Sequence, residues 1–316
     1  MTDPLQTTLR QLHGRVRRPV VTIGNFDGVH RGHRAIIHGV VERANQLQTD
    51  SVAVTFEPHP VSWFRKLPVD TFRLTSPERK LQLLAALGVA HPIALPFGDE
   101  LAAFSPEDFV ARIIADVLDA AEVWIGYDFN FGRGRAGTPA DLQRLAVERG
   151  IVVKILDPVL HDGDVVSSTR IRKALHAGDL QRAASLLGRP HAVEGRVEHG
   201  HARGRRLGFP TANIQPTAGM MVPHGVYVTT LHTDGQTLPA VTNIGLRPTF
   251  GEQTAPNVES FILDGLPPDA DLYGATIQVE LQAFLRPEQR FEDIEALKAR
   301  IAEDIRAARA HHGLDL

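Results

Sequence analysis

The sequence contains no cysteine among its 316 residues. This absence excludes disulfide bonds and thiolate metal ligands, and it is typical of a protein from a reducing compartment. Long apolar runs are also absent, because no stretch approaches the ~18 apolar residues of a membrane-spanning helix. The N-terminal residues lack the apolar core of a signal peptide. We therefore expect a cytoplasmic protein without a membrane anchor.

An excess of charge of one sign is lacking as well. The 34 Lys and Arg residues nearly balance the 37 Asp and Glu residues, which leaves a net charge of −3. Such a chain has no overall field to recruit nucleic acid or anionic lipid, so any anion must be bound by local groups. The hydrophobic content of 43% is that of a globular protein, and the length predicts about two domains.

The residues up to about position 187 alternate short β-branched runs with longer amphipathic segments. Strands are predicted at 20–23, 52–56, 92–95, 123–125 and 151–155, and helices at 34–46, 77–87, 106–118 and 139–149. Three helices begin with a hydroxyl residue followed by proline, a typical start signal, at Ser76, Ser105 and Thr138. Alternating strands and helices predict a parallel, Rossmann-like sheet, which binds ligands beyond the carboxyl ends of its strands.

After residue 187 glycine and proline become frequent and the apolar runs become short. Runs at 226–231, 238–244, 258–263 and 275–284 predict a small antiparallel barrel or sandwich. A terminal amphipathic helix follows, with an apolar stripe of Phe291, Ile294, Leu297, Ile301 and Ile305. We therefore expect two domains, residues 1–187 and 188–316.

The segment GNFDGVHRGH, residues 24–33, directly follows the first predicted strand. Its glycines let backbone amides approach a ligand, and it leads into a helix N-terminus, which favours an anion. His30 and His33 would add donors there. A metal between them would need a third ligand, for which Asp27 is available, but no matching second cluster is evident. HRGH resembles the HxGH signature of nucleotidyltransferases, where both histidines stabilise the α-phosphate region of a nucleotide.

A second signature, VSSTRIRKAL, occupies residues 166–175. Hydroxyl and guanidinium groups at a helix start form another phosphate cradle, although the segment could also be an ordinary capped surface helix. Two further segments end predicted strands on the ligand side, TFEPHP at 55–60 and IGYDFNFGRGRAG at 125–137. Their aromatic residues and backbone kinks are candidates for flavin or other ring binding, or for core packing: Phe56, Pro58, Trp63, Phe129 and Phe131.

The β-rich half contains GRVEHGHARGRRLGFPTANI, residues 195–214. This segment could be a basic surface loop. Thr211 and Asn213, however, offer hard oxygen ligands on one face of an extended chain, and Mg²⁺ needs few protein ligands beside phosphates and water. Glu259 in the predicted strand 258–263 is the best carboxylate to act as a base on an alcohol, although a solvent-facing structural role is equally open.

Taken together, GNFDGVHRGH, TFEPHP, SSTRIR, LLGRP, GRRLGFPTAN, GVYV, NIGLRPTFG and DLYG resemble the bacterial bifunctional riboflavin kinase/FAD synthetase family in this order. The resemblance covers essentially the whole chain. It implies an N-terminal FMN adenylyltransferase and a C-terminal riboflavin kinase built as a six-stranded barrel, with ATP and Mg²⁺ as requirements, riboflavin and FMN as substrates, and FMN and FAD as products. The segment 263–274 looks longer than the compact form of the family.

By this resemblance the residues divide between two sites. The adenylylation site would contain His30 and His33 with Gly24, Asn25, Asp128, Ser168, Thr169 and Arg172. The kinase site would contain Thr211 and Asn213 on Mg²⁺, Gly204 and Arg205 near ATP, and Glu259 as the catalytic base.

Two other functions stay open at this point. One is a different HxGH transferase, such as a pantetheine-phosphate or nicotinamide-nucleotide adenylyltransferase with an added β domain. The other is a flavin-binding sensor that keeps both folds without turnover. A homo-oligomer is compatible with any of these functions.

Overall fold

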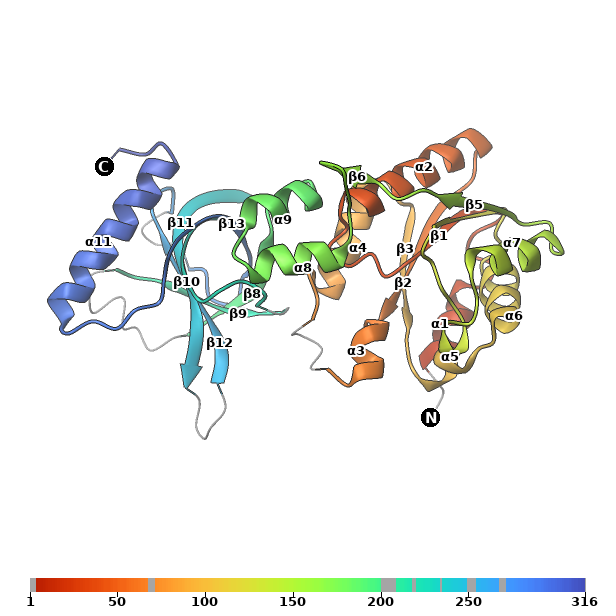
Figure 1. Cartoon of the computed structure of the whole chain (residues 1–316), viewed down its shortest axis with the longest axis horizontal. Helices are drawn as coiled ribbons and strands as arrows, with labels where there is room; N and C mark the ends of the chain where they lie inside the picture. Colours follow the sequence, from red (N-terminus) through yellow and green to blue (C-terminus); the bar gives the residue numbers. More distant parts are fainter. Residues whose placement is uncertain are drawn as a thin grey trace. The chain divides into compact units, whose positions relative to one another are not determined.

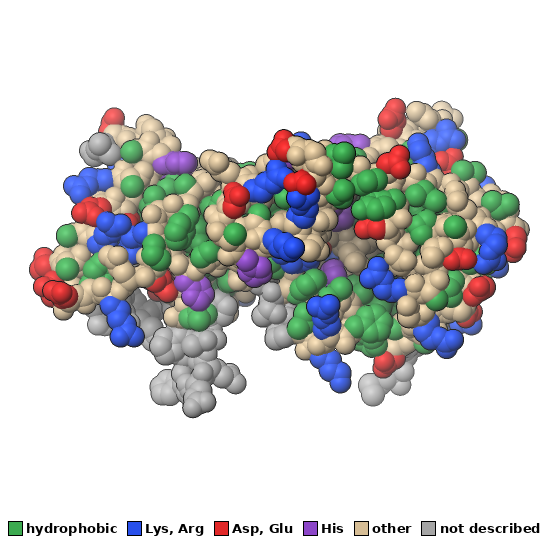
Figure 2. Space-filling model, viewed as in Figure 1, with side chains coloured by type: hydrophobic (Ala, Val, Ile, Leu, Met, Phe, Trp, Pro, Cys, Tyr) green, Lys and Arg blue, Asp and Glu red, His purple; other side chains and the backbone are tan. Residues whose placement is uncertain are grey.

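A computed structural model describes residues 4–67, 72–199, 209–217, 220–233, 235–248, 254–266 and 271–315. Contacts divide the chain into two compact units, Met1–Ser168 and Thr169–Leu316. None of the described helices is both long and apolar enough to cross a membrane. On the face shown in Figure 2, basic and acidic side chains are interspersed, as the near-zero net charge leads one to expect.

The first unit is built on a five-stranded parallel sheet with the order β3-β2-β1-β4-β5. The strands are β1 (Val20–Ile23), β2 (Ser51–Glu57), β3 (His91–Pro96), β4 (Glu122–Gly126) and β5 (Val152–Leu156). This is the Rossmann order, and each strand lies within one or two residues of its predicted position. A two-stranded hairpin, β6 (Leu160–His161) and β7 (Asp164–Val165), follows β5. The parallel sheet and its central β1 are therefore confirmed.

Helices cover both faces of the sheet (Figure 1). One face packs against α2 (Arg31–Leu47) and α4 (Pro77–Ala86). The other packs against α1 (Pro4–Leu12), α5 (Asp99–Ala103), α6 (Pro106–Asp108) with its π-helical continuation η2 (Phe109–Val117), and α7 (Pro139–Val147). The short α3 (Pro60–Arg65) follows β2, and the single turn η3 (Arg133–Arg135) follows β4.

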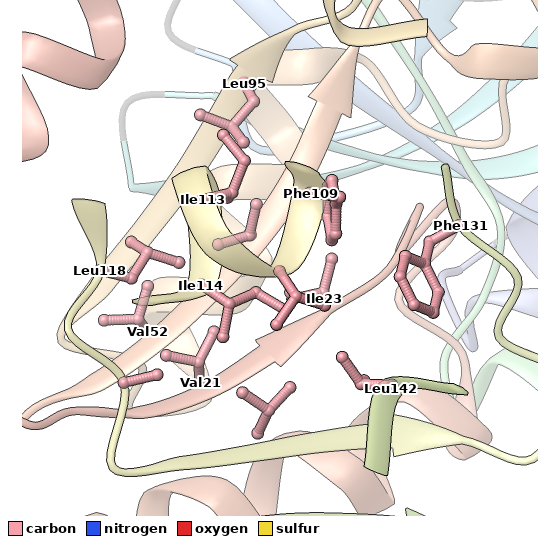
Figure 3. Close-up of a cluster of buried hydrophobic side chains, with 14 of the residues drawn as sticks. Val21, Ile23, Val52, Leu95, Phe109, Ile113, Ile114, Leu118, Phe131 and Leu142 are labelled. Carbon is pink, nitrogen blue, oxygen red and sulfur yellow. The ribbon is translucent and has the colours of Figure 1, made fainter. Parts of the chain in front are cut away.

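The core follows from the alternation of side chains along the strands. Val21 and Ile23 of β1 point into the larger cluster together with Ile113 and Ile114 of η2 (Figure 3). Val20 points the opposite way, towards α2. Since all four residues of β1 are buried, the strand is covered on both sides, as expected for a central parallel strand.

The second unit begins with α8 (Ser168–His176, whose first residue belongs to the first unit) and α9 (Leu180–Leu187). A closed six-stranded barrel follows, with the order β10-β11-β12-β9-β8-β13 and closure between β13 and β10. Its strands are β8 (Ala192–Glu198), β9 (Ala212–Pro216), β10 (Gly225–Thr233), β11 (Gln236–Pro248), β12 (Thr254–Ile262) and β13 (Thr276–Pro287). The antiparallel barrel is confirmed, whereas no separate sequence signal predicted β8 and β9.

The C-terminal helix α11 (Ile294–His311) packs on the barrel through only part of its predicted apolar stripe. Ala308 is buried and Ile305 is partly buried against the outer face of β10 and β11. Ile294 is 60% exposed, so the first turn of the helix does not contribute the contact that its sequence predicts. Phe291 of the predicted stripe lies before the helix, because Asp293 forms the N-cap and the helix begins at Ile294.

A buried ion pair connects α11 to β13. Arg286 donates to both carboxylate oxygens of Asp304, with N–O distances of 3.0, 3.0 and 2.7 Å, and both side chains are at most 10% exposed. We expect Asp304→Ala to lower the free energy of unfolding by about 3–5 kcal/mol, because it leaves the Arg286 charge buried without its carboxylate. Urea unfolding followed by far-UV circular dichroism measures this change.

The neighbouring exposed pair supplies the control. Glu303 contacts Arg300 at 2.7 Å in solvent, so Glu303→Ala should change stability by less than about 1 kcal/mol. Both tryptophans, Trp63 and Trp124, lie in the first unit. Their fluorescence therefore reports the unfolding of that unit and not the unfolding of the barrel, which is why circular dichroism is used. An Asp304→Ala protein with an unchanged dichroism transition would contradict the stabilising role of the pair.

Candidate functional sites

The loop between β1 and α2 has a strained backbone. Phe26 (φ 45°), Gly28 (φ 83°) and Val29 (φ 40°) all lie in the left-handed region. A β-branched residue is rarely found there, and such conformations persist where the surrounding structure over-determines them, often at functional sites. The loop lies at the carboxyl end of the central strand, where a parallel sheet binds its ligand.

His30 forms the N-cap of α2, and its Nδ1 accepts the backbone N–H of His33 at 3.3 Å. A neutral imidazole whose Nδ1 accepts carries its proton on Nε2, which makes that atom a hydrogen-bond donor. The two histidine rings are stacked, with centroids 3.6 Å apart and planes inclined by 15°. A Cβ atom at Gly32 would lie 3.2 Å from the His30 ring, so glycine at this position leaves room for the ring.

His33 is held neutral by its surroundings. Burial lowers the pKa of His33 well below 6.5, and the charges of His30 and Lys80 lower it further. The edge of Phe26 packs against the His33 ring at 5.2 Å. His33 Nδ1 is buried and has no hydrogen-bond partner among the described residues. His33 is therefore a neutral imidazole at neutral pH, and one of its two ring nitrogens carries a proton that it can donate.

Asp27, the candidate third ligand beside the histidines, is buried and bound to the backbone of a neighbouring segment. Asp27 is 3% exposed, and its Oδ1 accepts hydrogen bonds from the backbone N–H groups of Leu74 at 2.9 Å and Thr75 at 3.3 Å. Within the described part of the chain, no three His, Asp or Glu side chains form a cluster that could hold a metal ion. The Oδ1 atom of Asp27 is thus engaged by two backbone N–H groups.

The other residues predicted for this site lie on several elements. Gly24 and the exposed Asn25 open the loop, and Ser168 Oγ donates to the carbonyl of Asp27 at 2.9 Å. Asp128 is exposed just beyond β4. Thr169 and Arg172 follow Ser168 in α8 and belong to the second unit. Within that unit, Thr169 is exposed and Arg172 is half-buried.

The aromatic candidates divide into buried and accessible rings. Phe56 is 9% exposed and Phe131 is 6% exposed, and both belong to the core, with Phe129 stacked on Phe131 at 5.6 Å. Trp63 of α3 is only half-buried, as is Pro58, which lies two residues before this helix. Two rings that the sequence did not single out complete this cluster, Phe97 at 5.5 Å from Trp63 and the 56%-exposed Phe64 at 4.8 Å.

The barrel aligns four polar residues in one row. Glu198 of β8 pairs with Asn213 of β9, Asn213 pairs with Glu259 of β12, and Glu259 pairs with Asn243 of β11. Residues directly opposite each other on antiparallel strands share a face, with Cβ atoms about 5 Å apart. The neighbouring Val258 and Ser260 are fully buried, so the row lies on the outer face of the barrel.

The row joins the predicted base to one predicted metal ligand. Glu259 Oε1 accepts a hydrogen bond from Asn257 at 3.2 Å, and both Glu259 and Asn213 are half-buried. Thr211 lies one residue before β9 and is also half-buried. Gly204 and Arg205 lie outside the described residues. Sequence reasoning missed Glu198, whose approach to Asn213 depends on the pairing of β8 with β9.

Comparisons with known proteins agree with this two-unit organisation. The model of the FAD synthetase family matches residues 13–170, and that of the riboflavin kinase family matches residues 187–312. The bifunctional riboflavin kinase/FMN adenylyltransferase of Pseudomonas fluorescens is 41% identical over 302 residues, covering 96% of each chain. The protein of the same name from Escherichia coli is 39% identical over 313 residues, covering 97% of this chain and 98% of its own.

One solved structure is similar over almost the whole chain. It is described as a macrolide-efflux protein from Streptococcus pneumoniae, with a TM-score of 0.83 and 28% sequence identity. The match covers 96% of this chain and 97% of that chain. The likeness therefore extends to both units.

Proposed function

Because the chain belongs to the bifunctional riboflavin kinase/FMN adenylyltransferase family, we propose that its two reactions take place at the two sites described above. The protein phosphorylates riboflavin to FMN with ATP and then adenylylates FMN to FAD with release of pyrophosphate. The observation that carries the proposal is the presence, in separate units, of a stacked histidine pair at a helix N-terminus and a carboxylate–amide pair on a barrel.

FMN adenylylation is assigned to the loop of residues 24–33. An oxygen of the FMN phosphate attacks the α-phosphorus of ATP, the α–β bond breaks, and pyrophosphate leaves. The attacking phosphate is already anionic near neutral pH, so no base is required. His30 and His33 would donate N–H groups to the negative charge that develops, and one such donor is commonly worth about 3 kcal/mol.

Further groups would bind the nucleotide at this site. We assign the ATP phosphates to the amides at Gly24, to Asn25 and to Ser168, whose hydroxyl contacts the loop carbonyl of Asp27. The resemblance of the SSTRIR motif adds Thr169 and Arg172 as proposed phosphate donors. Asp128 would contact the nucleotide or flavin from the end of β4. Among the flavin candidates, Trp63 and Pro58 have accessible surface and would contact the flavin, whereas Phe56, Phe129 and Phe131 pack in or against the core.

Riboflavin phosphorylation is assigned to the outer face of the barrel. The ribityl 5′-hydroxyl attacks the γ-phosphorus of ATP and ADP leaves, and Glu259 accepts the hydroxyl proton. Thr211 and Asn213 fit Mg²⁺, because they offer a hydroxyl and an amide oxygen two residues apart where the chain enters β9. Asn213 pairs with Glu259 of β12. Bound there, Mg²⁺ would neutralise charge on the ATP phosphates. Gly204 and Arg205 would complete the ATP contacts.

We also propose residues 1–187 as the adenylyltransferase domain and residues 188–316 as the kinase domain. The ranges matched by the two family models support this boundary, although contacts group α8 and α9 with the barrel. The absence of cysteine supports a cytoplasmic location. Riboflavin, FMN and ATP are the proposed partners, without nucleic acid or membrane, and a homo-oligomer is compatible with both sites.

Two ATP analogues separate the proposed reactions. With Mg²⁺ and riboflavin, α,β-methylene-ATP should yield FMN but no FAD, because its α–β bond cannot be cleaved in this way. With FMN, β,γ-imido-ATP should yield FAD, whereas with riboflavin it should yield no FMN. Chromatography of the flavins measures both, and EDTA should stop the kinase. FMN formation from riboflavin with β,γ-imido-ATP would overturn the assignment of γ-phosphoryl transfer to the kinase.

A further inference from the structure

A buried lysine contacts the loop that carries the histidines. Lys80 of α4 is 4% exposed, and its Nζ donates to the carbonyl oxygen of Asn25 at 3.3 Å. Thr55 Oγ1 donates to the same oxygen at 2.9 Å. Lysine is almost never fully buried without a specific partner. One loop carbonyl is thus held by a hydroxyl and by a buried ammonium group.

The charge of Lys80 is balanced by two carboxylates. Burial lowers the pKa of Lys80, whereas the charges of Asp27 and Glu57 raise it and that of Arg73 lowers it. Arg73 is itself 5% exposed and forms an ion pair with Glu57. Burial raises the pKa of Glu57, against the effects of Arg73 and Lys80. Two basic and two acidic side chains therefore interact electrostatically, and Lys80 connects them to the loop through the Asn25 carbonyl.

Residues 72–76, here named the strap, contain Arg73 and form hydrogen bonds with the histidine-bearing loop. Phe72 packs edge-on against His59 at 5.2 Å, and the N–H groups of Leu74 and Thr75 bind Asp27. In return, Gly28 N–H donates to Thr75 Oγ1 at 3.2 Å. The strap ends at Ser76, which caps α4 one turn before Lys80.

These contacts explain how a strained loop is kept in place. Residues held at positive φ cost about 1–3 kcal/mol each and persist only where neighbours over-determine them. Phe26, Gly28 and Val29 are such residues, and they lie between the Asn25 carbonyl and His30. The contacts of Asp27 with the strap and of Lys80 with Asn25 hold the loop on both sides of Phe26.

We propose that Lys80 is a positioning residue for adenylyl transfer, which orients the histidine-bearing loop through the Asn25 carbonyl without touching substrate. The inference rests on the proposed placement of this reaction at His30 and His33. No motif in the sequence marks Lys80, since it lies in an ordinary amphipathic helix.

The same lysine also acts on the electrostatics of His33. The charged groups that face His33 are His30 and Lys80, and those that face Lys80 are Asp27, Glu57 and Arg73. The positive charge of Lys80 disfavours protonation of His33. Removing it raises the pKa of His33, so protonation begins at a higher pH than in the wild type.

The test is Lys80→Met, which keeps the apolar length of the side chain and removes the ammonium group. At saturating FMN and ATP we expect kcat for FAD formation to fall about tenfold, the scale of losing a hydrogen bond from a charged donor. The KM for FMN and the rate of FMN formation from riboflavin should stay unchanged. NMR of ¹³C-labelled histidine, assigned with His33→Ala, should show the His33 resonance titrating at higher pH.

Leu142→Ala is the control for a general loss of packing, because Leu142 of α7 is completely buried in the cluster on the other face of the sheet. It should lower stability without changing kcat or the His33 titration. An unchanged kcat in Lys80→Met would overturn the proposal. A kcat loss in Lys80→Met that Leu142→Ala reproduces, with an unmoved His33 resonance, would also overturn it, because the loss would then come from lower stability alone.

Thr55→Val serves if Lys80→Met fails to fold. It removes the other donor to the Asn25 carbonyl without changing charge, so kcat should fall about threefold while the His33 titration stays in place. Wild-type kcat in this variant would overturn positioning through the carbonyl. His33→Ala separates the positioning role of Lys80 from the placement of adenylyl transfer at the histidines. Wild-type FAD formation in His33→Ala would contradict the placement of the reaction itself.

Discussion

Replacing His33 with alanine should lower FAD formation from FMN by about 100- to 1000-fold, the usual effect of removing one donor to a developing oxyanion. The reason is geometric. The His33 ring is stacked 3.6 Å from His30 at the N-terminus of α2, so its loss removes a donor and the support of the second ring. FMN formation from riboflavin should be unaffected, because it is assigned to the other unit. Both rates are measured by flavin chromatography.

His38→Ala is the matched control for this variant. His38 lies in the same helix and is exposed, so both activities should remain at the wild-type level. His33→Gln, which retains an N–H donor, should recover part of the lost rate. Loss of both activities in His33→Ala with an intact dichroism spectrum would contradict the assignment of one reaction to each unit.

Replacing Glu259 with glutamine should have the opposite selectivity. Glutamine keeps the shape and can still accept a hydrogen bond from Asn257, but it cannot accept the proton of the riboflavin hydroxyl. General-base catalysis typically contributes about 100- to 10,000-fold, so FMN formation should fall by this factor. FAD formation from supplied FMN should remain unchanged, because an anionic phosphate needs no base.

The decisive comparison is Glu198→Gln. Glu198 flanks Asn213 on the opposite side from Glu259, so it is the alternative carboxylate in the row. It is exposed, whereas Glu259 is half-buried, and we therefore expect Glu198→Gln to retain FMN formation. If Glu198→Gln lost more FMN formation than Glu259→Gln, the catalytic base would be Glu198 of β8 instead of Glu259. Asn213→Ala should also lose FMN formation alone, with partial recovery at raised Mg²⁺ concentration.

Local interactions explain which structural predictions succeeded. The caps at Ser76, Ser105 and Thr138 each accept a backbone N–H three residues ahead, so the signal and its partner lie in one short segment. The buried parallel strands were equally evident, because apolar runs of β-branched residues reflect burial on both faces. The predicted apolar stripe of α11 was wrong at Ile294, which is exposed. Sequence periodicity shows which face of a helix is apolar, but not how much of the helix length packs against the barrel.

By itself, the sequence determined the order of the two folds, the family, and the motifs that contain His30, His33, Asn213 and Glu259. The tertiary structure alone decided which other groups surround them. Lys80 reaches Asn25 across 55 positions of sequence, and Glu198 meets Asn213 only through the pairing of β8 and β9. Such contacts depend on how separate elements pack, and residue type and spacing along one segment carry no record of that packing.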